Sequence, residues 1–138
     1  MEASVTWKEE LSFSGISDSG FTVPLGASKK VGGKNDGFKP MELLLIGLAG
    51  CTAMDVISIL KKKRQQISSF EVKVFADRAD THPKVFTKVK ILYKISGKNV
   101  SESAVERAME LSEGTYCPAQ AMLGKAFPIE LAYEIREE

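Results

Sequence analysis

The longest apolar run in the chain lies between Pro40 and Arg64 and predicts a helix. Pro40 suits the first helical position, and the basic residues that close the run suit a helix C-terminus because of the helix dipole. The apolar side chains between these ends point in every direction around the axis, whereas a surface helix shows one apolar stripe. The pattern therefore predicts a buried central helix, with Cys51 in its middle.

The length of this helix favours a homodimer. At about 1.5 Å per residue it would measure roughly 36 Å, which crosses a domain whose radius of gyration is about 14 Å. One small chain does not easily cover such a rod on all sides, so we expect a second copy to complete the cover. Gly47, Ala49, Gly50 and Ala53 would let either the partner's helix or a substrate approach the backbone closely.

Strand patterns flank the central helix. Ser4 to Ser14 alternates, with Val5, Trp7, Leu11 and Phe13 on one face, and predicts one half-buried strand. A turn at residues 18–20 leads to a returning strand at residues 21–25, where Pro24 indicates a sheet edge.

The second half of the chain repeats this alternation in three further strands. They are predicted at residues 70–77, 85–95 and 129–135. A helix with a capping box at Ser103 and Glu106 lies between them, and Gly114 is expected to end it. Pro118 begins a third helical piece with Cys117 at its N-cap. The order β-β-α-β-β-α-α-β predicts a single α+β domain over residues 1–138.

Composition narrows the classes of function. The 19 basic and 18 acidic residues nearly cancel, so the chain lacks the basic footprint of a nucleic-acid-binding protein. Asp55 and the flanking alternating strands argue against a membrane span, and the first residues contain no signal-peptide core. We expect a cytoplasmic protein. Two cysteines and one histidine match no zinc spacing, so we expect no metal.

Cys51 and Cys117 are the candidate chemical groups, and two interpretations of them stay open. They form either a redox pair or two inert packing residues, because free cysteine is often buried. A redox Cys51 reacts as the thiolate and needs a cation or several donors to hold it. Asp55, one helical turn on, would oppose that ionisation. Arg78 is the candidate cation, with a solvated strand-end charge as its alternative role. Backbone N–H groups at the N-cap would favour a thiolate at Cys117.

Three segments resemble the OsmC/Ohr family, in particular its shorter OsmC-like branch. They are PMELLLIGLAGCTAMDV at residues 40–56, HPKVF at residues 82–86 and YCPAQAMLGKAFPI at residues 116–129. The resemblance implies an intertwined homodimer with the central helices side by side and two sites at the subunit interface. It implies a hydroperoxide reductase in which Cys51 is peroxidatic and Cys117 resolving. A lipoyl-type dithiol is the implied external reductant, with no resident cofactor.

One part of the family pattern is missing here. Family members carry Pro-Glu before the helix, and that Glu pairs with an Arg from the N-terminal strands to hold the thiolate. Met41 stands at the Glu position here, Glu42 follows one residue late, and no arginine precedes Arg64. Glu42 and Arg78 remain candidate supporting residues.

Two functional hypotheses follow from the resemblance and its gap. The first is a thiol peroxidase for organic hydroperoxides, with Leu48 and Met54 lining an apolar pocket that favours an alkyl substrate. The alternative is a non-enzymatic dimer that binds a small apolar ligand or senses oxidation.

Overall fold

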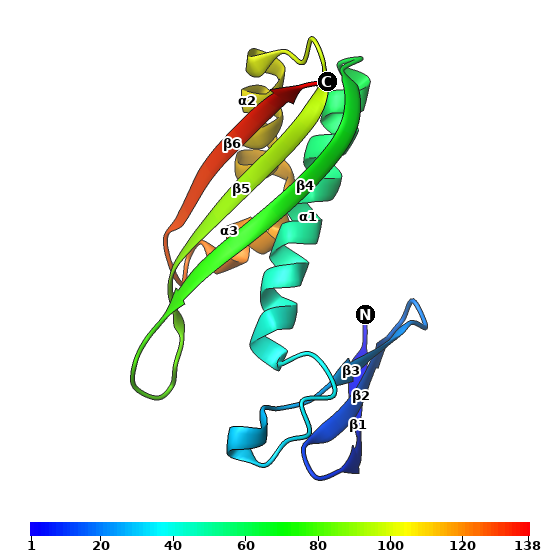
Figure 1. Cartoon of the computed structure of the whole chain (residues 1–138), viewed down its shortest axis with the longest axis vertical. Helices are drawn as coiled ribbons and strands as arrows, with labels where there is room; N and C mark the ends of the chain where they lie inside the picture. The colour runs from blue at the N-terminus through cyan, green and yellow to red at the C-terminus, as the bar shows by residue number, and fades with distance from the viewer. The chain divides into compact units, whose positions relative to one another are not determined.

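A computed structural model describes residues 1–138 as two compact units, Met1–Leu45 and Ile46–Glu138. The division falls within the long helix α1 (Pro40–Lys62), which begins at Pro40 as the sequence predicts. The element order is β-β-β-α-β-β-α-α-β, with one strand more than the sequence predicts (Figure 1). The fold class is α+β, as predicted.

The extra strand arises in the N-terminal unit. The segment predicted as one strand is a hairpin of β1 (Ala3–Glu9) and β2 (Ser12–Ser17), and Glu10 at its turn has φ 47°. Trp7 and Phe13 are cross-strand partners and share a face, and a β-bulge between Trp7 and Glu9 keeps the two residues in phase with the sequence alternation across the turn. The periodicity alone therefore hid the turn. β3 (Thr22–Leu25) completes the antiparallel sheet in the order β1-β2-β3, with Pro24 on an edge strand as predicted.

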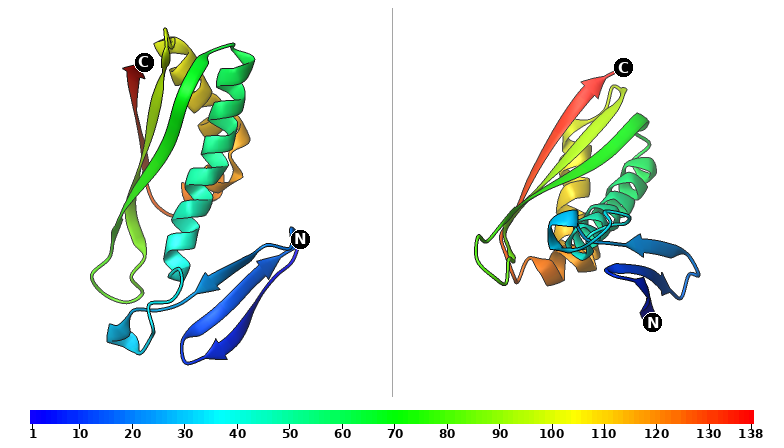
Figure 2. Two further views of the ribbon diagram at one scale, coloured as in Figure 1. Left: turned by 45° about the vertical axis from the view of Figure 1, so that its right-hand side comes forward. Right: turned by 60° about the horizontal axis from the view of Figure 1, so that its bottom comes forward.

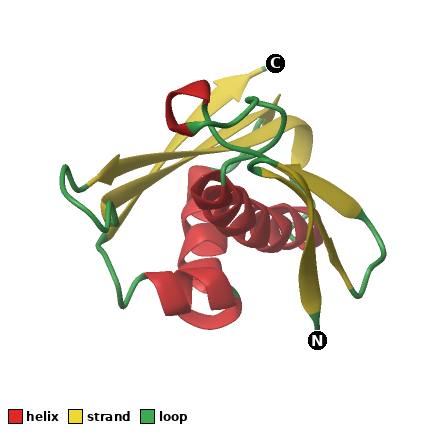
Figure 3. Ribbon diagram, turned by 90° about the horizontal axis from the view of Figure 1, so that it is seen from below, coloured by secondary structure: helices red, strands yellow, loops and turns green.

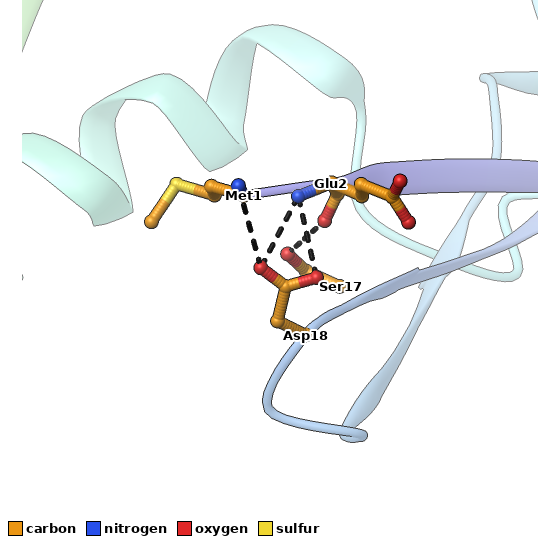
Figure 4. Close-up of polar contacts among 4 residues, drawn as sticks. All are labelled: Met1, Glu2, Ser17 and Asp18. Carbon is orange, nitrogen blue, oxygen red and sulfur yellow. Dashed lines mark hydrogen bonds and ion pairs between the residues drawn. The ribbon is translucent and has the colours of Figure 1, made fainter.

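Side-chain hydrogen bonds hold both ends of strand β2 in this small sheet. At one end the carboxylate of Asp18 accepts hydrogen bonds from the Glu2 N–H, and Ser17 Oγ donates to the Glu2 carbonyl (Figure 4). Elsewhere the buried Ser12 Oγ donates to Asp36 Oδ2 over 2.7 Å. This second contact anchors the loop between β3 and α1.

The C-terminal unit is a three-stranded sheet with helices on one face (Figures 2 and 3). Its strands are β4 (Gln66–Arg78), β5 (Phe86–Lys98) and β6 (Ile129–Glu137), with β5 in the centre. β4 and β5 run antiparallel, whereas β5 and β6 run parallel. A parallel pair needs a long crossover, and α2 (Glu102–Leu111) and α3 (Pro118–Leu123) provide it.

The core of this unit lies under β5. Alternate β5 side chains are almost fully buried, as the sequence pattern predicts, and they share the core with one stripe of α1 and one of α2. The members are Leu48, Val56, Leu60, Val89, Ile91, Tyr93, Ile95, Ala104, Val105, Ala108 and Met109.

α1 is buried on one stripe only in the single chain. Its buried residues recur at every fourth position, Leu48, Thr52, Val56 and Leu60. Met54 is 74% exposed and Ile46 52% exposed, so the prediction of burial all round is wrong for one chain alone. By length and composition α1 could cross a membrane, but the central helix of a globular domain has the same properties, so this is weak evidence.

The boundaries of α2 differ from the prediction at both ends. Its N-cap is Ser101, whose side chain accepts from the Ala104 N–H, and not Ser103. At the other end α2 runs into a π-helical turn (Ser112–Tyr116) that contains Gly114. This turn carries the chain directly to Cys117.

Candidate functional site

The two cysteines lie in one place although they are far apart in the sequence. Cys51 is half-exposed on α1, Cys117 is 2% exposed at the start of α3, and both are free thiols. Thr52, the residue after Cys51, is hydrogen-bonded to Ser112 and Gln120, which stand before and after Cys117 in the chain. The two cysteine segments therefore lie side by side.

The local chain fixes Cys117 at the N-cap of α3, as Pro118 predicts. The Gln120 N–H donates to Cys117 Sγ over 3.3 Å, and the Cys117 N–H donates to the Ser112 carbonyl over 2.8 Å. Burial nevertheless raises the pKa of the Cys117 thiol to about 11, because the loss of solvation outweighs the backbone N–H groups that favour the thiolate. The N-cap N–H groups do lower the pKa, as predicted, but burial outweighs them and the net pKa of Cys117 lies above its ordinary value.

A buried hydroxyl network joins the two cysteine segments. Thr52 follows Cys51 on α1 and is fully buried. Its Oγ1 lies 2.7 Å from the Tyr93 hydroxyl, 2.8 Å from Ser112 Oγ and 3.1 Å from Gln120 Nε2. Ser112 Oγ in turn donates to Asp55 Oδ2 over 2.9 Å.

The direction of these hydrogen bonds follows from counting protons. Ser112 has one hydroxyl hydrogen and gives it to the Asp55 carboxylate, so Thr52 must donate to Ser112. Thr52 Oγ1 then accepts from both Tyr93 and Gln120. Burial raises the pKa of Tyr93 to about 12, which keeps it a phenol and a donor. Gln120 Oε1 is buried with no partner.

Glu42 and Arg78, the candidate supporting residues, make other contacts. Glu42 Oε1 accepts a hydrogen bond from the Lys39 N–H over 2.8 Å, so its carboxylate caps the start of α1. Arg78 is exposed at the end of β4, and its Nε donates to the Lys84 carbonyl over 2.9 Å. These contacts give both residues structural roles in the single chain.

The two candidate pocket residues, Leu48 and Met54, lie in different surroundings. Leu48 is 1% exposed and belongs to the core. Met54 lines a surface cavity of about 440 Å³ together with residues from α1 and from the end of α2 onward, namely Asp55, Ser58, Ile59, Lys62, Leu111 and Tyr116. Of these two residues, Met54 alone lies on a surface that a ligand can contact.

None of the four network residues was predicted as functional from the sequence, namely Thr52, Tyr93, Ser112 and Gln120. One signal was present at Thr52. It is the polar member of the stripe that recurs every fourth residue on α1, and a hydroxyl in a core stripe requires hydrogen-bond partners. No group of three His, Cys, Asp or Glu side chains is arranged to hold a metal.

The family model described as OsmC-like protein matches residues 33–132, and the chain belongs to this family. The fold is the OsmC/Ohr fold.

Individual relatives extend the match to nearly the whole chain. Protein YhfA of Escherichia coli K12 is 38% identical over 98% of both chains. A hypothetical protein of Aquifex aeolicus has 30% identity and a TM-score of 0.86, over 99% of this chain and 96% of that one. A Legionella pneumophila structure is named as an organic hydroperoxide resistance protein OsmC. It has 14% identity and a TM-score of 0.70, over 96% of this chain and 95% of that one, a likeness of fold alone.

Proposed function

We propose that the protein is a thiol peroxidase that reduces organic hydroperoxides through Cys51 and Cys117. The observation that carries the proposal is that two free thiols, one half-exposed and one buried, lie on segments that are hydrogen-bonded side by side. Membership in a family with members named for organic hydroperoxide resistance supports the same chemistry. The proposed setting is the cytoplasm, where both thiols stay reduced between turnovers.

The cycle balances with the two sulfurs and an external dithiol. The Cys51 thiolate attacks the outer oxygen of the hydroperoxide, the O–O bond breaks, and the alkoxide takes a proton to leave as alcohol. Cys51 is now a sulfenic acid. The Cys117 sulfur attacks the Cys51 sulfur, the thiol proton and the hydroxyl leave as water, and a disulfide forms. A lipoyl-type dithiol reduces that disulfide by thiol exchange.

The half-exposed position of Cys51 and the cavity at Met54 suit an alkyl substrate. Cys51 and Met54 are three residues apart on α1, so their side chains are neighbours on the helix surface. The cavity has the size of a small-molecule site and lies beside Cys51, which is not among its lining residues. Met54, Ile59 and Leu111 give it an apolar wall, next to the polar Asp55, Ser58 and Lys62. Such a wall favours an organic hydroperoxide over hydrogen peroxide.

The proposed active form is a homodimer built on the exposed faces of α1. A Cβ added at Gly47 or Gly50 would meet nothing within 4 Å in the single chain. Glycine inside a helix costs about 1 kcal/mol relative to alanine, and no contact within this chain requires it at these positions. Close approach of a second α1 is a reason for both glycines, and it would cover Ile46 and Met54. The partner is also the proposed source of the cation that holds the Cys51 thiolate.

Thiol stoichiometry and turnover test the proposal together. One equivalent of cumene hydroperoxide should consume two free thiols per chain in the wild type and one in Cys117→Ser. Cys51→Ser should abolish turnover with dihydrolipoamide as reductant. Wild-type turnover in Cys51→Ser would end the proposal.

The second candidate is a non-enzymatic dimer that binds a small apolar ligand or senses oxidation. It is favoured by the contacts of Glu42 and Arg78, which cap a helix and hold a loop instead of forming the family's Arg–Glu pair. The two candidates differ in rate. A sensor oxidises once and slowly, whereas a peroxidase sustains many turnovers with excess dithiol.

A further inference from the structure

Thr52 connects the two cysteine segments through a single hydroxyl group. On the α1 side it is the residue next to Cys51. On the other side its partners, Ser112 and Gln120, stand before and after Cys117 in the chain. We call Thr52, Ser112, Gln120 and their hydrogen bonds the Thr52 clamp.

The same two partners also hold the atoms of Cys117 itself. The Ser112 carbonyl accepts the Cys117 N–H, and the Gln120 N–H reaches Cys117 Sγ. Each partner of Thr52 thus has one bond to Thr52 and one to Cys117. A displacement of the Cys117 turn away from α1 would break both bonds to Thr52, together with the bond from Ser112 to Asp55.

The clamp depends on Thr52 more than on its other members. Gln120 is buried, and its Oε1 has no partner, so its side chain is held by the hydrogen bond that Nε2 makes to Thr52. Ser112 retains Asp55 as a second partner. A valine has nearly the shape of threonine and would fill the same space in the stripe between Leu48 and Val56. The hydroxyl therefore acts through its hydrogen bonds to Tyr93, Ser112 and Gln120, which a valine would leave unmade.

We infer that Thr52 is a positioning residue for disulfide formation between Cys51 and Cys117, an inference that rests on the proposed function for its place in a catalytic cycle. A disulfide requires a narrow range of Cα separation and dihedral angle. A clamp that fixes one cysteine segment on the other restricts their relative motion to conformations close to that geometry. Its effect is a higher effective concentration of one thiol at the other.

The effective concentration can be measured without peroxide. The reduced protein exchanges with glutathione disulfide to give the Cys51–Cys117 disulfide and two molecules of glutathione. Titration in glutathione buffers gives the equilibrium constant directly. Thr52→Val should lower it about tenfold, because two buried hydrogen bonds to the Cys117 turn are lost. Thr52→Ser, which keeps the hydroxyl, should stay within about threefold of the wild type.

Val56→Ala is the matched control for general destabilisation. Val56 is fully buried one turn further along α1 and has no polar contact. The substitution should lower the unfolding free energy but leave the glutathione equilibrium unchanged. Should Thr52→Val fail to fold by circular dichroism, Gln120→Met removes one arm of the clamp, and a fall of about threefold or more is then expected.

The outcomes separate this inference from the proposed function. An equilibrium constant for Thr52→Val equal to that of the wild type overturns the positioning role. So does an equal fall in Thr52→Val and Val56→Ala. A wild-type protein that forms the disulfide in glutathione but consumes no hydroperoxide overturns the peroxidase and leaves the clamp intact.

Discussion

The buried Cys117 thiol should react slowly with alkylating agents in the folded protein. The perturbation is the folding of the chain itself, which raises the pKa of this thiol from about 9 to about 11 through burial. Iodoacetamide reacts with the thiolate, so its rate reports how much of the thiol is ionised.

The expected slowing combines ionisation with nucleophilicity. At pH 8 about one thiol in ten is ionised at a pKa of about 9, and about one in a thousand at about 11, a loss of about 100-fold. A thiolate of higher pKa is the better nucleophile. With a Brønsted coefficient of about 0.4–0.5, this shift raises the rate constant of the thiolate itself by roughly tenfold. The net effect is about tenfold slower alkylation. At 2% exposure, steric exclusion slows the reaction further.

Peptide-resolved mass spectrometry at low conversion measures Cys51 and Cys117 separately in the reduced wild type. The control is the same chain in guanidinium chloride. Between pH 8 and 10 the folded Cys117 rate should rise tenfold per pH unit, whereas the unfolded rate should level off near pH 9. Equal folded and unfolded rates, or a folded rate that levels near pH 9, would refute the reasoning.

Three further predictions concern stability and assembly. In urea titrations the unfolding free energy should fall by up to about 3 kcal/mol as pH rises from about 9 to about 11, because the Cys117 thiol ionises first in the unfolded chain. Cys117→Ala should reduce this fall, and an unchanged dependence on pH in that variant would contradict the assignment to Cys117. Glu42→Ala should cost about 0.5–1 kcal/mol through loss of the cap to Lys39, and Glu42→Gln less, since its amide oxygen also accepts; equal losses in both would indicate a role for the charge. Gly50→Leu should give monomers in light scattering while Gly50→Ala stays closer to wild type, and dimers of Gly50→Leu would remove α1 from the interface.

The sequence predicted most of the regular elements because their signals are local. Pro40 and the basic residues that close the apolar run predicted the bounds of α1. Alternating apolar positions predicted β4, β5 and β6, and Pro118 predicted Cys117 as an N-cap. The β1–β2 hairpin was missed because a β-bulge between Trp7 and Glu9 offsets the change of phase at the two-residue turn, so Trp7 and Phe13 stay in step with the alternation. Ser101 and not Ser103 caps α2, a difference of two residues that local pattern does not resolve.

The sequence by itself determined an α+β chain with an apolar central helix and two cysteines, because periodicity, capping residues and composition act within a few residues of each other. Only the tertiary structure decided what surrounds the sulfurs. Crossing of α1 with the turn before α3 brings Cys51, Thr52, Ser112 and Cys117 together, and burial there reverses the effect of the N-cap on the Cys117 thiol. Solvation and hydrogen-bond partners depend on residues far apart in the chain, so their balance appears only after folding.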